Sequence, residues 1–273
     1  MEIRRCSVSL PSGTSAPGGE TNAYVLGRDP AALVDPAERS DALDRLVADA
    51  RIEHVVVTHA HPDHVGAVAA YAAETNATVW ARAGRTDRFR AATGVEPDRE
   101  LRAGTIIELE REEDGDERAG SADERIRVLD APGHAPDHVA LEAGRDGPIC
   151  CGDCAVRDGS VAVTAPEGDM RAYLTTLRRL RAIDPPRLYP GHGPPIDAPR
   201  ETLERLLDHR RQRERRILEA VAGGAGTLEQ ILDAAYDKDL TGVRDLAKAT
   251  VVAHLEKLAV EDRLEWDGER ALV

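Results

Sequence analysis

One short stretch of the chain gathers most of the side chains that could do chemistry. The sequence Thr58-His-Ala-His-Pro-Asp-His64 follows a β-branched, strand-like run and precedes an Ala-rich, helix-like one. A tight loop after a strand can point His59 and His61 at one metal ion. Asp63 and His64, at the start of the following helix, can then face a neighbouring ion. Because imidazole and carboxylate are ligands that zinc accepts, we expect a metal site here rather than histidines exposed on a surface loop.

Three further candidate ligands stand at similar places later in the chain. His134 and His192 each follow a Pro-Gly turn at the end of a strand-like segment, and Asp153 follows the apolar run 149–151 in the same way. One such turn is more often incidental. Together, four strand ends supply a full set of ligands, as expected where loops complete a site at one sheet edge. The seven candidates are His59, His61, Asp63, His64, His134, Asp153 and His192.

The segments that must position these side chains alternate between strand-like and helix-like patterns. Apolar and β-branched runs predict strands at 23–26, 32–34, 54–58, 78–81, 105–109, 126–129, 139–142, 149–151 and 188–189. Helical spacing predicts helices over 41–50, 64–74 and 169–183. The acidic stretch 110–124 is predicted to be a solvated loop without a function of its own.

The pattern changes after Asp197. A long charged helix is predicted over 200–221, and Thr227-Leu-Glu-Gln230 is a capping box that opens the next helix. A third helix over 245–260 precedes two short strands joined around Asp267-Gly268, a strong hairpin signal. Three helices followed by a hairpin is the order of a winged helix. We therefore expect a catalytic domain over 1–199, a linking helix over 200–214 and a winged-helix domain over 215–273.

Composition narrows the class of protein. The chain has 273 residues, 41% of them hydrophobic, and a formal net charge of −14. No apolar run approaches the roughly 20 residues that span a bilayer, and the N-terminus lacks the apolar segment of a secretory signal. We predict a cytoplasmic protein with no membrane partner. The acidic, lysine-poor composition resembles that of proteins from salt-loving cells, although a GC-rich genome, in which arginine displaces lysine, is an alternative.

The cysteines offer a second, weaker signal. Cys151-Gly-Asp-Cys154 has the C-x-x-C spacing of redox or zinc motifs. A structural zinc knuckle would need a second such pair, and the sequence has none. Cysteines at the end of an apolar strand usually act as small buried hydrophobic residues, and we favour that interpretation.

Taken in order, these phrases resemble the metallo-beta-lactamase superfamily over nearly all of the first 200 residues. The similarity is strongest to its beta-lactamase-like protein 2 branch, which carries a C-terminal winged helix. The supporting phrases are Thr21-Asn-Ala-Tyr-Val-Leu26, the H-x-H-x-D-H motif, Gly133-His-Ala-Pro-Asp-His-Val139, Gly152-Asp-Cys154, Tyr189-Pro-Gly-His-Gly193 and His209-Arg-Arg-Gln-Arg213. The resemblance implies an α+β fold, an αββα sandwich with the site at one sheet edge.

The resemblance also implies a division of the ligands. His59, His61 and His134 would bind one metal ion, and Asp63, His64 and His192 the other, with Asp153 bridging both. In Leu33-Val-Asp-Pro-Ala37, where many relatives have Asp-Thr-Gly, Asp35 is kept. We expect Asp35 to orient a ligand histidine, as carboxylates behind metal-bound histidines do, while the turn around it differs.

The expected chemistry is hydrolysis by a hydroxide that bridges two zinc ions, with manganese or iron as alternative metals. Such a pair lowers the pKa of water towards neutrality, so no serine or cysteine nucleophile is required. Asp63 would also hold the hydroxide. His138 could donate to the substrate oxyanion or act as an acid; the alternative is a structural role behind the ligands.

The substrate stays open between classes. The resemblance favours an endoribonuclease acting on single-stranded RNA, which the winged helix could guide. The acidic charge is not a usual nucleic-acid footprint and suits a small-molecule acyl hydrolase better, one that splits a thioester as glyoxalase-II-like relatives do, or a lactone or lactam. A non-enzymatic winged-helix regulator with a metal sensor domain is a third reading, which the complete ligand set disfavours. A homodimer through the winged helix is possible.

Overall fold

The computed structural model describes residues 1–14, 16–109, 124–237 and 239–273. All but the last residue of the acidic stretch predicted as a loop, 110–124, therefore lies outside the described residues. The chain forms two compact units. The first comprises Met1–Ala131, Asp137–Asp158 and Pro185–Pro199, and the second Pro132–Pro136, Gly159–Asp184 and Arg200–Val273.

A six-stranded sheet in the order β1-β2-β3-β4-β5-β6 forms one layer of the first unit. β1, β2 and β3 pair antiparallel, while β3 to β6 run parallel. Parallel neighbours end at the same edge of a sheet, so the loops after β3 and β4 come together there. The strands are β1 Ile3–Ser9, β2 Glu20–Gly27, β3 Ala31–Val34, β4 Ile52–Val56, β5 Thr78–Arg82 and β6 Arg99–Leu101.

A five-stranded sheet in the order β11-β10-β9-β8-β7 forms the next layer of the first unit. Its strands pair antiparallel except β10 and β11, which run parallel and therefore end at the same edge. The strands are β7 Ile106–Glu108, β8 Arg125–Asp130, β9 Val139–Ala143, β10 Ile149–Gly152 and β11 Leu188–Pro190.

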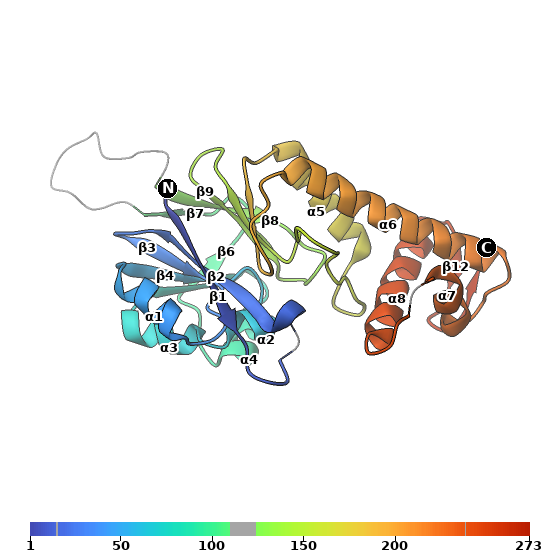
Figure 1. Cartoon of the computed structure of the whole chain (residues 1–273), viewed down its shortest axis with the longest axis horizontal. Helices are drawn as coiled ribbons and strands as arrows, with labels where there is room; N and C mark the ends of the chain where they lie inside the picture. The colour runs from blue at the N-terminus through green and yellow to red at the C-terminus, as the bar shows by residue number, and fades with distance from the viewer. Residues whose placement is uncertain (15, 110–123, 238) are drawn as a thin grey trace. The chain divides into compact units, whose positions relative to one another are not determined.

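Alternating side chains of the first sheet build two apolar cores, because successive residues of a strand face opposite ways. Val25 and Leu33 pack towards the helices, whereas Leu26 and Val34 pack against side chains of the second sheet. The helices on the outer face are visible in Figure 1, so the first unit has a helix, sheet, sheet order. Its helical segments are the short 3-10 turn Pro17–Gly19, α1 Asp41–Ala48, α2 Pro62–Val65, α3 Val68–Thr75 and α4 Thr86–Thr93.

The helix predicted over 64–74 is wrong as a single element. The chain forms α2 and α3 instead, separated at Gly66 and Ala67. A side chain at Gly66 would bring its Cβ within 2.4 Å of the Ala37 carbonyl oxygen, and Ala67 N–H donates to Pro36 at 2.9 Å. The close approach of the 36–37 turn thus interrupts the helix. The prediction also lacked β1, α4 and β6, whose short or highly charged sequences carry little apolar periodicity.

The second unit contains helices and one hairpin around its own apolar core. The core joins α6, α7 and α8 through side chains such as Ile217, Leu232 and Leu255, and Figure 1 shows α7 and α8 beside the C-terminal half of α6. The predicted capping box is confirmed, with Thr227 and Gln230 bonded reciprocally. Among the described residues, no helix has the length and apolar character that a membrane crossing needs. The elements are α5 Met170–Ile183, α6 Pro199–Ala222, α7 Leu228–Ala235, α8 Arg244–Val260, β12 Glu265–Trp266 and β13 Ala271–Leu272.

Candidate metal centre

The histidine-rich loop follows β4 and runs into the short helix α2. Pro62 occupies the first turn of α2, where its missing N–H costs nothing, and the loop therefore ends with Asp63 and His64 on the helix. His59, Asp63 and His64 are buried, with 1%, 8% and 0% of their surface exposed. Side chains of this polarity are rarely buried without partners or a metal ion.

Asp35 fixes this loop from the adjacent strand end. It follows β3, which pairs parallel with β4, and takes a left-handed backbone conformation with φ 49°. Its Oδ1 accepts from the Thr58 backbone N–H at 2.7 Å, and its Oδ2 accepts from the Thr58 hydroxyl at 2.8 Å. The same Oδ2 lies 3.0 Å from His64 Nδ1. A proton on that nitrogen leaves the Nε2 lone pair of His64 for a metal ion.

Two groups of possible ligands overlap at His64. His59, His64 and Asp153 form one, and Asp63, His64 and His192 the other, with each group's ligand atoms within 4.8 Å of one another. His192 Nε2 lies 3.4 Å from Asp63 Oδ2 and 3.3 Å from Asp153 Oδ2. The end of β4, the end of β10 and the loop after β11 thus bring these side chains together.

His61 contributes a further nitrogen next to this cluster. Its Nδ1 lies 2.9 Å from His59 Nε2, and the two rings meet edge to face with centroids 4.5 Å apart. His134 belongs to the second unit, where its Nδ1 lies 2.7 Å from the Ala162 carbonyl oxygen. Since a carbonyl can only accept, Nδ1 carries the proton and the Nε2 lone pair of His134 is available as a ligand.

Two imidazole nitrogens in the cluster have no hydrogen-bond partner among the described residues. They are the Nε2 atoms of His64 and His192, both buried. Burial alone would lower the pKa of His192, but its interactions with Asp153 and Asp63 raise that pKa to about 10. Burial is likewise outweighed at His64, whose pKa is raised chiefly by Asp35. Buried nitrogens facing carboxylates fit a bound cation, which would satisfy both kinds of group at once.

Two glycines make room for the cluster. A Cβ at Gly191 would lie 2.4 Å from Asp153 Oδ1 and 2.7 Å from His64 Cε1. A Cβ at Gly152, which has φ 47°, would lie 2.6 Å from His138 Nε2 and 2.7 Å from Thr58 Oγ1. No larger residue fits at either place without moving a candidate ligand or its support.

The loop that carries His192 is held from β2. Asn22 Nδ2 donates to the carbonyl oxygens of Pro190 and Gly193 at 2.9 and 2.7 Å, and the Tyr24 hydroxyl donates to Pro190 at 2.6 Å. His192 Nδ1 lies 2.8 Å from the Glu20 carbonyl oxygen, which directs Nε2 towards the carboxylates. This explains the role of the Asn-Ala-Tyr phrase in the sequence.

His138 and Asp137 support the cluster from behind. The Asp153 backbone N–H donates to His138 Nε2 at 2.9 Å, so this nitrogen carries no proton, and Nδ1 lies 3.7 Å from Cys154 Sγ. Asp137 Oδ2 accepts from the Ala60 N–H at 2.7 Å, between His59 and His61. Sequence reasoning missed Asp137 and Thr58, because a carboxylate or hydroxyl that binds backbone has no spacing signal of its own.

The four cysteines are free and buried. Burial raises the pKa of the Cys151 thiol to about 12, and raises the pKa values of Cys150 and Cys154 as well. A neutral thiol is a poor nucleophile and a poor metal ligand. The arrangement agrees with the structural interpretation rather than a redox motif.

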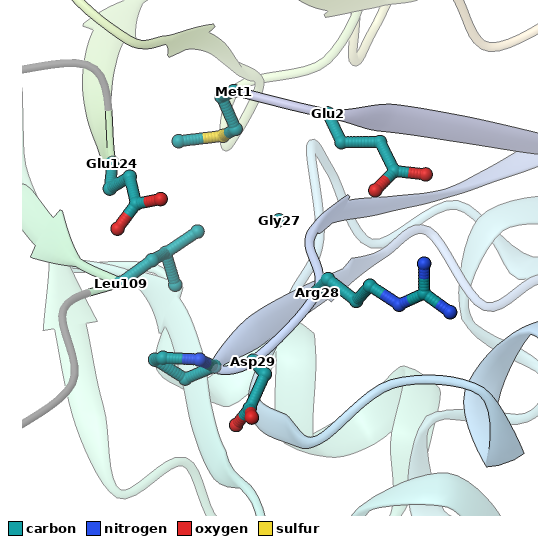
Figure 2. Close-up of a pocket in the computed structure, with 8 residues that line it drawn as sticks. Met1, Glu2, Gly27, Arg28, Asp29, Leu109 and Glu124 are labelled. Carbon is teal, nitrogen blue, oxygen red and sulfur yellow. The ribbon is translucent and has the colours of Figure 1, made fainter.

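A separate hollow of about 220 Å³ lies elsewhere in the first unit. Figure 2 shows it between Met1, Leu109 and Glu124 on one side and the Gly27–Asp29 turn on the other. None of the seven candidate ligands is among the described residues that line it. This hollow is therefore not the candidate metal centre.

Comparison with known proteins agrees with this geometry. Residues 16–192 match the domain described as the metallo-beta-lactamase superfamily. The chain is 31% identical over 271 residues to a beta-lactamase-like protein 2 homolog of Drosophila melanogaster, covering 93% of this chain and 86% of that protein. It is 36% identical over 165 residues to a hydroxyacylglutathione hydrolase of Methylococcus capsulatus, covering 59% of this chain and 57% of that protein.

Solved structures share the fold. The metallo-beta-lactamase family protein TTHA1429 from Thermus thermophilus superposes with a TM-score of 0.74 at 22% identity, covering 99% of this chain and 98% of that one. TTHA1623 in a di-iron-bound form superposes with a TM-score of 0.51 at 28% identity, covering 75% of this chain and 97% of that one.

Proposed function

The chain belongs to the metallo-beta-lactamase superfamily and is a metal-dependent hydrolase of that superfamily; from this premise we propose that it hydrolyses a small acyl ester or thioester at a pair of zinc ions. The metal assignment depends on the buried Nε2 atoms of His64 and His192, which have no hydrogen-bond partner among the described residues and lie 3.7 and 3.3 Å from oxygens of Asp153. The remaining steps assign the ligands, the metal and the substrate class.

The proposed ligands divide into two sets. His59, His61 and His134 would hold the first ion, and Asp63, His64 and His192 the second. Asp153 would serve both sets, since it groups with His59 and His64 as possible ligands of one ion and one of its oxygens lies 3.3 Å from His192 Nε2. Both sets combine imidazole with carboxylate in the way that catalytic dinuclear sites require.

The chain itself limits how far His134 can be from His59 and His61. Its loop, Pro132–Pro136, leaves the first unit at Ala131 and returns at Asp137, whose carboxylate binds the Ala60 N–H. Three residues of extended chain span at most about 11 Å.

We propose zinc as the metal. A set of histidines and aspartates without cysteine suits zinc but also suits manganese or iron. The di-iron form of TTHA1623 keeps iron as an alternative. Metal analysis of the chain purified from cells grown with balanced zinc, iron and manganese would decide among the three.

When bound, the metal pair supplies an activated water and a positive charge for the oxyanion of the substrate. Asp63 and Asp153 would supply the negative charge that holds both ions. We propose that Asp63, which has 8% of its surface exposed, orients the attacking water. His138 serves as a positioning residue, because its Nε2 accepts the Asp153 N–H and cannot donate to a substrate. The buried, neutral thiols take no part.

The surface charges favour an acyl compound over a nucleic acid. The basic run of α6 is not a free cationic face: Arg211 pairs with Asp208 at 3.0 Å and Arg216 pairs with Asp237 at 2.6 Å. Arg210 and Arg213 are drawn into the second unit by bonds to the carbonyl oxygens of Val161 and Ala235. With a net charge of −14, little remains to attract a polyanion. The hydrolase name of the Methylococcus relative supports the same class.

An endoribonuclease remains the second candidate. It is favoured by the order α6, α7, α8 and the β12–β13 hairpin, which we propose to be a winged helix, and by the similarity to beta-lactamase-like protein 2 homologs over most of the chain. Turnover of a generic thioester, a chromogenic lactam and single-stranded RNA, each with and without chelator and with His61→Ala, separates the candidates. Chelator-sensitive thioester turnover supports the proposal, and RNA cleavage alone would replace it with the second candidate.

A further inference from the structure

A second hollow lies entirely within the second unit, apart from the seven candidate ligands. It has a volume of about 210 Å³. Its walls come from the 160–162 segment, α6, the 236–246 segment and the start of α8. Leu240, Val243 and Leu246 give it an apolar side, and 50% of the surface of Leu246 is exposed at its rim.

Two arginines, Arg210 and Arg213, also line this pocket. Arg210 is only 3% exposed, and its Nε has no hydrogen-bond partner among the described residues. Its guanidinium carbon lies 5.5 Å from the centre of the Tyr173 ring, while that of Arg213 lies 3.4 Å from the centre of the Tyr236 ring. Stacking on aromatic faces fixes guanidinium groups without neutralising them.

The two arginines have no bonded carboxylate among the described residues, although the charge of Asp237 acts on Arg213. Among the residues the structure describes, neither Arg210 nor Arg213 forms an ion pair, and no acidic side chain lines the pocket. Burial lowers the pKa of Arg213 against an opposing effect of Tyr236, and the positive charges of Arg216 and Arg210 lower it further while Asp237 raises it. In a chain with 50 acidic residues, a pair of arginines without a bonded carboxylate is unusual and would be stabilised by an anion.

The first turn of α8 borders the same pocket, and the N–H groups of Val243 and Ala247 are bonded to the carbonyl oxygens of Leu240 and Val243. Val243 occupies the capping position of this 17-residue helix and has no side chain that can cap it. The first turn of a helix presents free N–H groups and a partial positive charge. Val243, Leu246 and Ala247 all line the pocket, so this first turn and the two arginines meet at one cavity.

We propose that this pocket binds a small organic anion, a carboxylate or phosphate group carried on a short apolar body. The anionic oxygens contact Arg210, Arg213 and the first turn of α8, as oxyanions do at such sites. The apolar body lies against Leu240, Val243 and Leu246. This ligand site goes beyond the hydrolase activity and does not depend on it.

The pocket is connected to His134 through two successive carbonyl groups. Arg210 Nη2 donates to the Val161 carbonyl oxygen, and the next carbonyl, of Ala162, lies 2.7 Å from His134 Nδ1. The residue whose carbonyl fixes His134 thus belongs to the same 160–162 segment that lines the pocket.

Titration calorimetry on the full-length, metal-loaded chain tests the proposal with hexanoate, hexyl phosphate and inorganic phosphate as probes. We expect both hexyl-bearing anions to bind more tightly than inorganic phosphate, with hexanoate against hexyl phosphate deciding which headgroup is preferred. Arg210→Gln should weaken binding about tenfold or more, the loss typical of a charge-assisted hydrogen bond. Arg211→Gln, one residue along α6 and paired with Asp208, should leave binding unchanged.

Because Arg210 is buried, its replacement could disturb folding. Three substitutions of Leu246 therefore provide a second test. Leu246 is half exposed, so its variants should fold. All three variants lose the apolar contact of Leu246, so they are compared with one another: Leu246→Glu should bind hexyl phosphate about tenfold more weakly than Leu246→Gln by repulsion, and Leu246→Lys should bind it more tightly than Leu246→Gln. The proposal is overturned if none of the three probes binds, or if the three Leu246 variants bind hexyl phosphate with equal affinity. Either result stands whatever the outcome for thioester turnover.

Discussion

Asp35 and His64 form a buried pair in which Asp35 Oδ2 lies 3.0 Å from His64 Nδ1, with 1% and 0% of their side-chain surfaces exposed. The same carboxylate holds Thr58 through two further hydrogen bonds. One side chain at the end of β3 thereby sets both the start of the ligand loop after β4 and the ring orientation of a ligand on α2.

Replacing Asp35 should therefore weaken metal binding without removing a ligand. We expect Asp35→Asn to lower metal affinity about 10- to 100-fold, the range found for partners of ligand histidines. Competition with a chromogenic chelator measures this. Asp49→Asn is the control, because Asp49 is 61% exposed and forms ion pairs with Arg4 and Arg28 rather than with a candidate ligand; equal affinities for Asp35→Asn and the control would contradict the assignment.

Metal binding should release protons at neutral pH. The pKa of His192 in the metal-free chain is raised to about 10, so at pH 7 this histidine is protonated and an ion must displace the proton. Calorimetric titrations in buffers of different ionisation enthalpy should show proton release at pH 7 that declines as the pH approaches 10. No dependence on the buffer would show that His192 is not a ligand.

The same shift predicts how the metal-free chain responds to alkali. A histidine whose pKa is raised on folding stabilises the folded state fully below its unfolded pKa of about 6.5 and loses that contribution as the pH rises through its folded value. The metal-free protein should therefore lose stability between pH 7 and pH 10 in urea titrations. His192→Gln should flatten this part of the profile, whereas a wild-type slope in the variant would assign the loss to another group.

Asp137 should be needed for both stability and metal binding. Asp137→Ala leaves the buried Ala60 N–H without its acceptor, which costs about 1–3 kcal/mol, and frees the backbone between His59 and His61. Asp98→Ala is the matched control, since Asp98 accepts the Val79 N–H at 2.8 Å in the same unit. We expect both variants to unfold at lower urea concentration but only Asp137→Ala to lose metal affinity.

His138 should behave as a positioning residue. His138→Phe keeps a ring but removes the acceptor of the Asp153 N–H, so metal content and kcat should fall together while the shape of the pH–rate profile is retained. His138→Asn, whose side-chain oxygen can accept, should recover part of the activity. A full metal complement with one limb of the pH profile missing would instead make His138 an acid in the reaction.

The sequence predicted those parts of the fold that carry strong local patterns. The β-branched run before the histidine loop became β4, and the amphipathic stretch predicted over 169–183 became α5, with Asp169 as its N-cap. The break between α2 and α3 was not predictable from local sequence. It depends on the close approach of Ala37 to Gly66, two residues that are distant in the sequence and lie after the paired strands β3 and β4.

The site shows the same division. Histidines in a tight spacing are a strong signal in the sequence, whereas a single histidine after Pro-Gly becomes a candidate only together with the other strand ends. The supports do not: Asp137, Thr58 and Asn22 act on backbone groups that only the folded sheets bring near. His138 Nε2 accepts a hydrogen bond from the Asp153 backbone N–H. The spacing of residues in the sequence does not reveal this contact.

The most direct test of the dinuclear centre is the number of metal ions retained per chain, measured by mass spectrometry of metals after loading and dialysis. The account predicts two ions in the wild-type chain and one in each of His134→Ala and His192→Ala, because these histidines belong to different ions. A wild-type chain that retains one ion or none, or variants that retain as many ions as wild type, would contradict it.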